Sequence, residues 1–158
     1  METIIIYNIS DLIPYAESLK AEPLLAVDTE TTGLNPHIHK IRLIQLAWKE
    51  KILIIDCFSF LPEGYTIIKE ILESQSLKIF QNAKFDLQFF MAMNILPPNI
   101  FDTMIAAQLL APLGGPKKFN LGELSRYYLN EEMDKELQKS DWSKHLTEDQ
   151  IRYAGKDA

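Results

Sequence analysis

The sequence predicts an α/β domain built on a mixed sheet, and three observations lead to this fold class. Apolar segments of strand length alternate along the chain with segments whose apolar residues recur at helical spacing. Residues 24–27 are apolar throughout, which is typical of a strand buried on both faces. Two strand-like segments, 42–48 and 51–56, are separated only by Lys49 and Glu50, which predicts a hairpin. Alternating strands and helices with an early hairpin indicate a mixed sheet covered by helices.

The remaining elements follow the same pattern in chain order. Strands are expected at 3–7, 24–27, 42–48, 51–56, 77–80 and 100–101, and helices at 10–20, 65–74, 84–93, 103–110, 121–128 and after Thr147. Ser10 and Asn82 are the expected caps of the first and third helices. Thr147 and Gln150 have the spacing of a capping box. Two prolines and two glycines make 111–118 a loop.

Composition is that of a globular protein without a membrane span. The 158 residues are 47% hydrophobic and 24% charged, and no segment approaches the roughly 18 consecutive apolar residues that a span needs. The first residues have no basic leader and no small-residue cleavage site, so we do not expect a signal peptide. The one cysteine, Cys57, lies in an apolar run and is expected to be a reduced core residue. A cytoplasmic protein fits these observations.

The net charge of −6 is unusual for a partner of nucleic acid, which favours a basic surface. Two bound divalent cations would add +4 and change −6 to −2. The ions, and not the carboxylates, would then set the local field. Charge alone therefore does not exclude a nucleic-acid substrate.

Two carboxylates, Asp28 and Glu30, end the most apolar strand. Residues two apart on a strand point to the same face, so these side chains should converge. Two adjacent negative charges at the end of a buried strand are costly unless a cation binds there. Ligands also bind at the carboxyl ends of strands in open α/β sheets. The alternative is a solvated strand end before the Thr32-Gly33 turn, and the pair taken alone favours that alternative.

Three further side chains have positions that suit the same site. Asp86 lies one turn into the helix that follows the strand at 77–80, although an acidic first turn also suits the helix dipole. Tyr153 and Asp157 are four residues apart and share a face of the final helix. Together they could hold a metal ion and its water, whereas the alternative is an ordinary surface pair. Each piece taken alone favours the structural alternative.

In chain order, Asp-x-Glu at a strand end, Asn-x-x-Phe-Asp at a helix start and Tyr-x-x-x-Asp on a late helix resemble the DEDD superfamily of 3′–5′ exonucleases. The tyrosine matches the branch that includes ribonuclease D and the proofreading domains of family A DNA polymerases, and the sister branch has histidine where this chain has Arg152. The resemblance covers 24–157. Further matching segments are Asp28-Thr29-Glu30-Thr31-Thr32-Gly33-Leu34-Asn35-Pro36, Ile41-Arg42-Leu43-Ile44-Gln45-Leu46-Ala47, Phe101-Asp102-Thr103-Met104, Asp134-Lys135 and Ser140-Asp141-Trp142.

The resemblance implies a ribonuclease H-like fold, with a mixed five-stranded sheet flanked by helices on both faces. It also implies one exonuclease domain over 1–158, whose last helix ends earlier than in the family. The cofactors would be two divalent cations, Mg²⁺ or Mn²⁺, which suit an all-oxygen site. Asp28 would bridge both ions, Glu30 and Asp157 would hold the ion that activates water, and Asp86 would serve the second. Tyr153 would orient the attacking water.

The resemblance also implies a set of substrate-binding residues. Leu34 would press against the terminal base, with a loop anchor as the alternative. Gln81 and Asn82 would donate to sugar or phosphate, with a strand end and a helix cap as the alternatives. Thr29 and Phe85 complete this set. Other residues are interpreted structurally: Lys117 and Lys118 as solvated loop residues that could track the backbone, Asp102 as a helix cap or ligand support, His37 and His39 as surface residues, and Trp142 as a packing anchor.

The function that follows is hydrolysis at 3′ ends of single-stranded nucleic acid, with release of nucleoside 5′-monophosphates and with DNA slightly favoured over RNA. The expected partners are single-stranded DNA or RNA 3′ ends, with a DNA polymerase as the parent protein or partner, and no membrane. One alternative is a catalytically impaired domain that binds nucleic acid or scaffolds a polymerase. Another is a ribonuclease H-like endonuclease or integrase, against which the Tyr-x-x-x-Asp helix argues.

Overall fold

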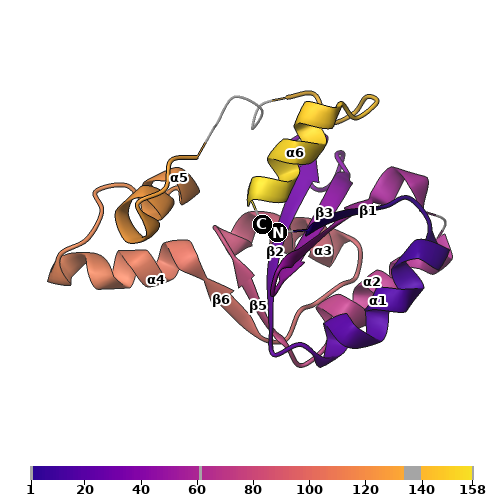
Figure 1. The fold of residues 1–158 in the computed structure, drawn as a ribbon, viewed down its shortest axis with the longest axis horizontal. Coiled ribbons are helices and arrows are strands. Elements are labelled where there is room, and N and C mark those ends of the chain that lie inside the picture. The colour runs from indigo at the N-terminus through magenta and orange to yellow at the C-terminus, as the bar shows by residue number, and fades with distance from the viewer. Residues whose placement is uncertain (1, 61, 134–139, 158) are drawn as a thin grey trace.

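In the part of the chain that the structure describes, six strands form one mixed sheet in the order β1-β4-β3-β2-β5-β6 (Figure 1). The strands are β1 Glu2–Ile6, β2 Leu24–Thr31, β3 Ile41–Trp48, β4 Lys51–Asp56, β5 Leu77–Phe80 and β6 Ile100–Asp102. β2 is antiparallel to β3 and parallel to β5. The α/β class is therefore confirmed. The described sheet contains all six strands that the sequence predicts, one more than the five that the resemblance implies, because the three-residue β6 pairs with β5.

The structure is a computed structural model, and it describes residues 2–60, 62–133 and 140–157, with the side chains of 62, 156 and 157 left out of the description. The helices are α1 Ile9–Ala21, α2 Pro62–Leu72, α3 Ala83–Ala92, α4 Thr103–Leu110, α5 Leu121–Leu124 and α6 Glu148–Asp157. Shorter turns are η1 Cys57–Ser59, η2 Ala111–Leu113 and the π-helical η3 Ser125–Leu129. The expected helix over 121–128 is thus one α-helical turn that continues as a π-helical turn.

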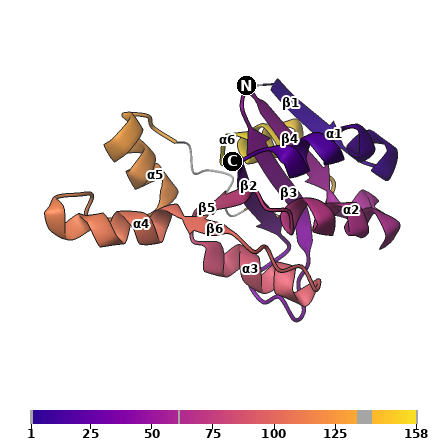
Figure 2. The same cartoon turned by 90° about the horizontal axis from the view of Figure 1, so that it is seen from below.

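Helices cover both faces of the sheet, as expected. One face packs against α1, α2 and α3 and holds the larger apolar core, with Leu12, Ile68 and Phe89 among its buried side chains. The other face packs against α6 through a smaller cluster that contains Trp142 and Tyr153. Figures 1 and 2 show α6 on the opposite side of the sheet from α1 and α2. The two faces therefore differ in how much apolar surface they bury.

The segment from α4 to η3 extends away from the sheet and is called the arm here (Figures 1 and 2). It comprises α4, η2, α5 and η3, residues 103–129. Many of its large apolar side chains are exposed, including Leu109 and Leu113. The arm therefore contributes less to the apolar core than the helices that lie on the sheet do.

The helix caps are partly as expected. Asn8, not Ser10, caps α1: the Asn8 side-chain oxygen accepts a hydrogen bond from the Asp11 amide at 3.1 Å. The Ser10 hydroxyl donates to that same oxygen, so Ser10 lies inside the first turn. Before α6 the predicted capping box forms in both directions between Thr147 and Gln150.

Two smaller expectations are also confirmed. Lys49 adopts a left-handed φ of 51° in the hairpin between β3 and β4. Cys57 is buried, and burial raises the pKa of its thiol to about 12, so the thiol stays protonated and behaves as a core residue. No helix in the described ranges is both long enough and apolar enough to span a bilayer.

Candidate active site

The end of β2 divides its side chains between the two faces of the sheet. Leu25 and Val27 belong to the larger core, whereas Ala26 packs against the cluster under α6. Because side chains alternate along a strand, Asp28 and Glu30 continue the α6 face and Thr29 continues the other. Asp28 is half-buried and Glu30 is buried. The predicted convergence of the two carboxylates on one face therefore agrees with the packing.

A cavity of about 1030 Å³ opens at this end of the sheet. Its walls come from β2 and the following loop, the turn between β5 and α3, the arm, the loop before α6, and α6 itself. Nine of the ten predicted site residues line it: Asp28, Thr29, Glu30, Leu34, Gln81, Asn82, Phe85, Asp86 and Tyr153. The tenth, Asp157, is the last described residue of α6, and its side chain lies outside the description.

Asp86 reaches the cavity from the first turn of α3, on the side of the sheet opposite α6. Its carboxylate is buried and accepts a hydrogen bond of 2.6 Å from the Thr29 hydroxyl. Burial raises the pKa of Asp86 to about 6, and the hydrogen bond from Thr29 opposes that rise. The Thr29 hydroxyl thus holds a carboxylate, a role that its assignment to substrate binding did not include.

The turn between β5 and α3 differs from the expectation at Asn82. This residue adopts a left-handed conformation, with φ 61° and ψ 51°, and its side chain makes no capping hydrogen bond within the described chain. Asn82 as the cap of α3 was therefore a wrong prediction. The neighbouring Gln81 amide donates to the Phe119 carbonyl at 2.7 Å and accepts from the Thr103 hydroxyl at 2.5 Å. Gln81 thus ties this turn to the arm while it lines the cavity.

Leu34 lies at the tip of a loop held by its own hydrogen bonds, and its side chain is 83% exposed at the rim of the cavity. The His39 ring packs against Gly33, where an added Cβ would lie 2.5 Å from the ring. The His39 ring nitrogen Nδ1 accepts from the Asn35 amide at 3.2 Å. His39 therefore braces the loop, a role that its interpretation as a surface residue missed.

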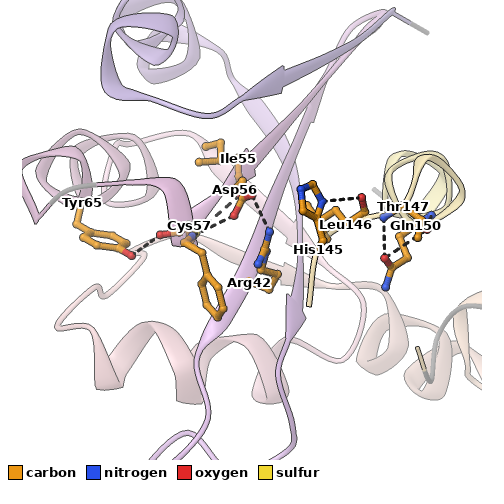
Figure 3. A network of polar contacts seen from close by, with 10 residues as sticks. Arg42, Ile55, Asp56, Cys57, Tyr65, His145, Leu146, Thr147 and Gln150 are labelled. Carbon is orange, nitrogen blue, oxygen red and sulfur yellow. Dashed lines mark hydrogen bonds and ion pairs between the residues drawn. The ribbon is translucent and has the colours of Figure 1, made fainter. Parts of the chain in front are cut away.

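Tyr153 enters the cavity from α6. The capping box of Thr147 and Gln150 fixes the start of this helix (Figure 3). The Tyr153 ring packs on Trp142 with 6.4 Å between ring centroids, and both side chains are buried. Trp142 is therefore the packing anchor that the sequence predicts.

The sequence as a whole is similar to those of known nucleases. The chain matches a family model described as 3′–5′ exonuclease over residues 3–158. The chain belongs to the 3′–5′ exonuclease family. The resemblance drawn from the sequence is thereby confirmed, and so is the enzyme class.

Individual relatives of this exonuclease agree with the family assignment. The chain is 33% identical over 140 residues to DNA polymerase I of Aquifex aeolicus (strain VF5). The aligned region covers 88% of this chain and 22% of the polymerase. The crystal structure of Escherichia coli RNase D, described as an exoribonuclease involved in structured RNA processing, is 28% identical with a TM-score of 0.84 and covers 99% of this chain and 41% of that one. The chain thus spans less than half the length of either protein.

A third comparison concerns fold alone. The structure of Brucella melitensis NrnC with bound Mg²⁺ has a TM-score of 0.79 at 24% identity, and covers 99% of this chain and 75% of that one. Together with RNase D, it confirms a ribonuclease H-like arrangement of sheet and helices for this exonuclease.

The arm supplies part of the exonuclease cavity that the sequence did not assign. Met104 and the segment that enters α5 line the cavity from the arm, and Met133 lies beside them in the lining. The segment that enters α5 consists of Phe119, Asn120, Leu121 and Gly122. No local motif marks these residues, because their place in the wall depends on how the arm returns toward β5. Lys117 and Lys118 are exposed and are not among the described residues that line the cavity.

A buried ion pair fastens the strand ends beside Glu30. Arg42 donates to the Asp56 carboxylate at 2.8 Å, and its guanidinium lies 4.6 Å from the centre of the Phe58 ring (Figure 3). Asp56 pairs with Leu43 across β3 and β4, and Leu43 pairs with Glu30 across β2 and β3. The pair therefore ties β3 to β4 beside Leu43, the residue that pairs with Glu30.

The donor set of the exonuclease cavity suits a hard divalent cation on chemical grounds. The carboxylates of Asp28, Glu30 and Asp86 offer only oxygen ligands, and all three line the cavity. Among the described side chains, no group of three or more His, Cys, Asp or Glu is arranged to hold a metal ion, and Asp157 lies outside that set.

Proposed function

We propose that this chain hydrolyses phosphodiester bonds at the 3′ end of single-stranded nucleic acid and releases nucleoside 5′-monophosphates. The observation that carries the proposal is the cavity at the end of β2, which Asp28, Glu30, Asp86 and Tyr153 line together. These four side chains come from three separate elements, so their meeting in one cavity is not a consequence of sequence proximity.

The proposed cofactors are two divalent cations, Mg²⁺ or Mn²⁺. When bound, they would activate the attacking water and relieve charge on the phosphate and the leaving oxygen. Asp28, Glu30 and Asp86 would hold them, together with Asp157 by its place on α6. The all-oxygen donor set supports this choice, as does the Mg²⁺ in the NrnC structure.

Tyr153 would orient the attacking water through its hydroxyl. A phenol with a pKa near 10 is a poor base at neutral pH, so orientation suits it better than proton removal. The packing of its ring on Trp142 limits where the hydroxyl can lie. Leu34 at the rim and Phe85 in the wall would contact the terminal base, and Asn82 would contact the sugar or phosphate.

DNA and RNA are the two substrates to compare, because the relatives include a DNA polymerase and a ribonuclease D. The sequence favours DNA slightly. A partnership with a polymerase rests on the same resemblance, and the strand with a 3′ end is the proposed partner in either case.

The decisive experiment is degradation of matched single-stranded DNA and RNA oligonucleotides, labelled at the 5′ end, with Mg²⁺, Mn²⁺ or a chelator. We expect a ladder that shortens from the 3′ end and disappears in the chelator. Asp28→Ala should abolish it, whereas Asp149→Ala removes an exposed carboxylate of α6 outside the cavity and should leave it intact. Binding of the strand without any ladder would favour a catalytically impaired binding domain, and internal cuts in a circular substrate would favour an endonuclease.

A further inference from the structure

One carboxylate outside the predicted site accepts hydrogen bonds from the starts of two helices. Asp102 accepts from the amides of Met104 and Ile105, at 2.8 and 3.3 Å, as the ordinary cap of α4. It also accepts from the amides of Asn82 and Ala83, at 3.2 and 2.9 Å, at the start of α3. Asp102 therefore caps α4 locally and α3 from 19 residues away.

This distant cap replaces the one that α3 would ordinarily supply itself. A residue before the first turn usually caps a helix with its own side chain and an extended backbone. Asn82 has a left-handed backbone instead, makes no capping hydrogen bond within the described chain, and lines the cavity. Asp102 thus satisfies the first amides of α3 while Asn82 stays in the cavity wall.

Sheet pairing and a second contact fix where Asp102 lies. β6 pairs with β5 in register, with Asp102 opposite Phe80, so the carboxylate is placed beside the turn that begins α3. The Thr103 hydroxyl donates to the Phe80 carbonyl at 3.1 Å and to Gln81 Oε1 at 2.5 Å. The turns after β5 and β6 are therefore joined by several hydrogen bonds, and neither moves alone.

We propose that Asp102 is a positioning residue of the exonuclease, which sets the start of α3 and thereby places Asp86 and Asn82 in the cavity. The inference rests on the proposed function of this cavity. Asp86 is three residues beyond Ala83, within the first turn, so a shift of that turn moves its carboxylate. Reacting groups displaced by about 1 Å can lose about a hundredfold in rate, which makes the cap important for the chemistry.

The test separates the two caps with two variants of the full chain. Asp102→Ser keeps a hydroxyl that can cap α4, but the side chain is too short to reach α3, whereas Asp102→Ala removes both caps. Asn8→Ala is the matched control, because it removes the cap of α1, and neither Asn8 nor any residue of that helix lines the cavity. The measurements are Tm, kcat and KM on a single-stranded oligonucleotide, and Mn²⁺ binding by calorimetry.

We expect both Asp102 variants to lose roughly tenfold to a hundredfold in kcat at a temperature where they are folded. Mn²⁺ should bind more weakly to both, while Tm should be higher in the serine variant than in the alanine variant. Asn8→Ala should lower Tm and leave kcat and Mn²⁺ binding unchanged.

Other outcomes overturn the inference. Recovery of kcat and Mn²⁺ binding together with Tm in Asp102→Ser would show that only the cap of α4 matters. Mn²⁺ binding that is unchanged in both Asp102 variants would also overturn the inference. This result counts even if the wild type does not degrade the oligonucleotide, because Mn²⁺ binding is measured separately from cleavage. If the wild type cleaves the oligonucleotide and Asp102→Ser is equally active, the proposed function is supported and the role of Asp102 is excluded. A wild type that neither cleaves nor binds Mn²⁺ would remove both.

Discussion

The two faces of the sheet are built differently, although the same strands form both. The face under α1, α2 and α3 is packed with apolar side chains such as Leu25, Val27 and Leu53. The face under α6 has a smaller apolar cluster that gives way to Asp28 and Glu30 at the end of β2. Because apolar burial is the main source of folding free energy, the first face should govern stability and the second face chemistry.

Buried charge shows the same difference. Lys78 is a fully buried cation, and it lies on the apolar face because it is two residues from Phe80 on β5. Its ammonium donates to the carbonyls of Ser74 and Ser76 and to the Ser74 hydroxyl, so neighbouring oxygens enclose it. The carboxylates of β2 instead line a cavity that a ligand can enter. A charge enclosed in this way is closed to ligands, whereas a charge at a cavity can serve a reaction.

The largest effect should follow from Asp28→Ala. We expect kcat to fall by at least about a thousandfold, because metal ions contribute several kcal/mol to such reactions. Tm should fall less than it does after truncation of a side chain in the larger core, since Asp28 is only half-buried and lines the cavity. The check is the rate of ladder formation beside a thermal melt. A large fall in Tm with full activity per folded molecule would contradict the division between the faces.

Leu53→Ala should have the opposite profile. Leu53 is completely buried in the larger core, so its truncation should cost about 2–5 kcal/mol of unfolding free energy. Urea unfolding measures the loss, and kcat at low temperature should match the wild type. Leu109→Ala is the matched control, because Leu109 is 75% exposed on the arm and its truncation should change stability by less than about 0.5 kcal/mol.

Tyr153→Phe sharpens the comparison within the α6 face. The phenyl ring can still pack on Trp142, so Tm should change little. Loss of the hydroxyl should lower kcat roughly tenfold, which corresponds to about 1.4 kcal/mol. Steady-state kinetics on a labelled oligonucleotide test this, and an unchanged kcat would remove Tyr153 from the proposed mechanism.

Gly33→Ala tests the loop at the rim of the cavity. An added Cβ would lie 2.5 Å from the His39 ring, so either that ring or the loop that presents Leu34 must shift. We expect KM to rise about tenfold, by about 1.4 kcal/mol, with little change in Tm. The two changes should not be additive: in a His39→Ala background the glycine substitution should have almost no further effect. Equal effects in both backgrounds would exclude the ring as the cause.

The last prediction concerns Lys78 and pH. Burial lowers the pKa of Lys78 from 10.5 to about 8. Between those values the unfolded chain binds more protons at this residue, so its contribution makes stability rise as pH increases from about 8 to 10.5. Lys78→Met should remove that rise, while Lys40→Met, at an exposed lysine, should keep it. Urea unfolding at several pH values measures both, and parallel curves for wild type and Lys78→Met would contradict the expectation.

Local pattern predicts much of this fold. The bounds of β5 and α4 agree with the expected 77–80 and 103–110, because a short apolar run and a helical repeat are each visible within a few residues. The capping box at Thr147 is likewise local. The cap of α1 was misplaced by two residues, because Asn8 and Ser10 both suit that position and only the backbone distinguishes them.

The candidate site was predicted by residue type and order, and nine of its ten members line one cavity. What the sequence could not determine are the contacts that hold those members. The Thr29 hydroxyl meets Asp86 across 57 residues, and Asp102 caps α3 across 19. The arm reaches the cavity at Phe119, where the Phe119 carbonyl accepts a hydrogen bond from the Gln81 side chain.

The sequence by itself thus determined the fold class and most element bounds to within a few residues, because periodicity and capping act over neighbouring residues. The acidic residues of the candidate site were predicted from their order along the chain, through the resemblance to the exonucleases. The tertiary structure decided which strand the sixth strand pairs with, the residue that caps α3 and the bracing of the loop by His39. These depend on the order in which strands pair, which brings distant segments to one end of the sheet. A local pattern contains no record of that order, and only the assembled sheet specifies it.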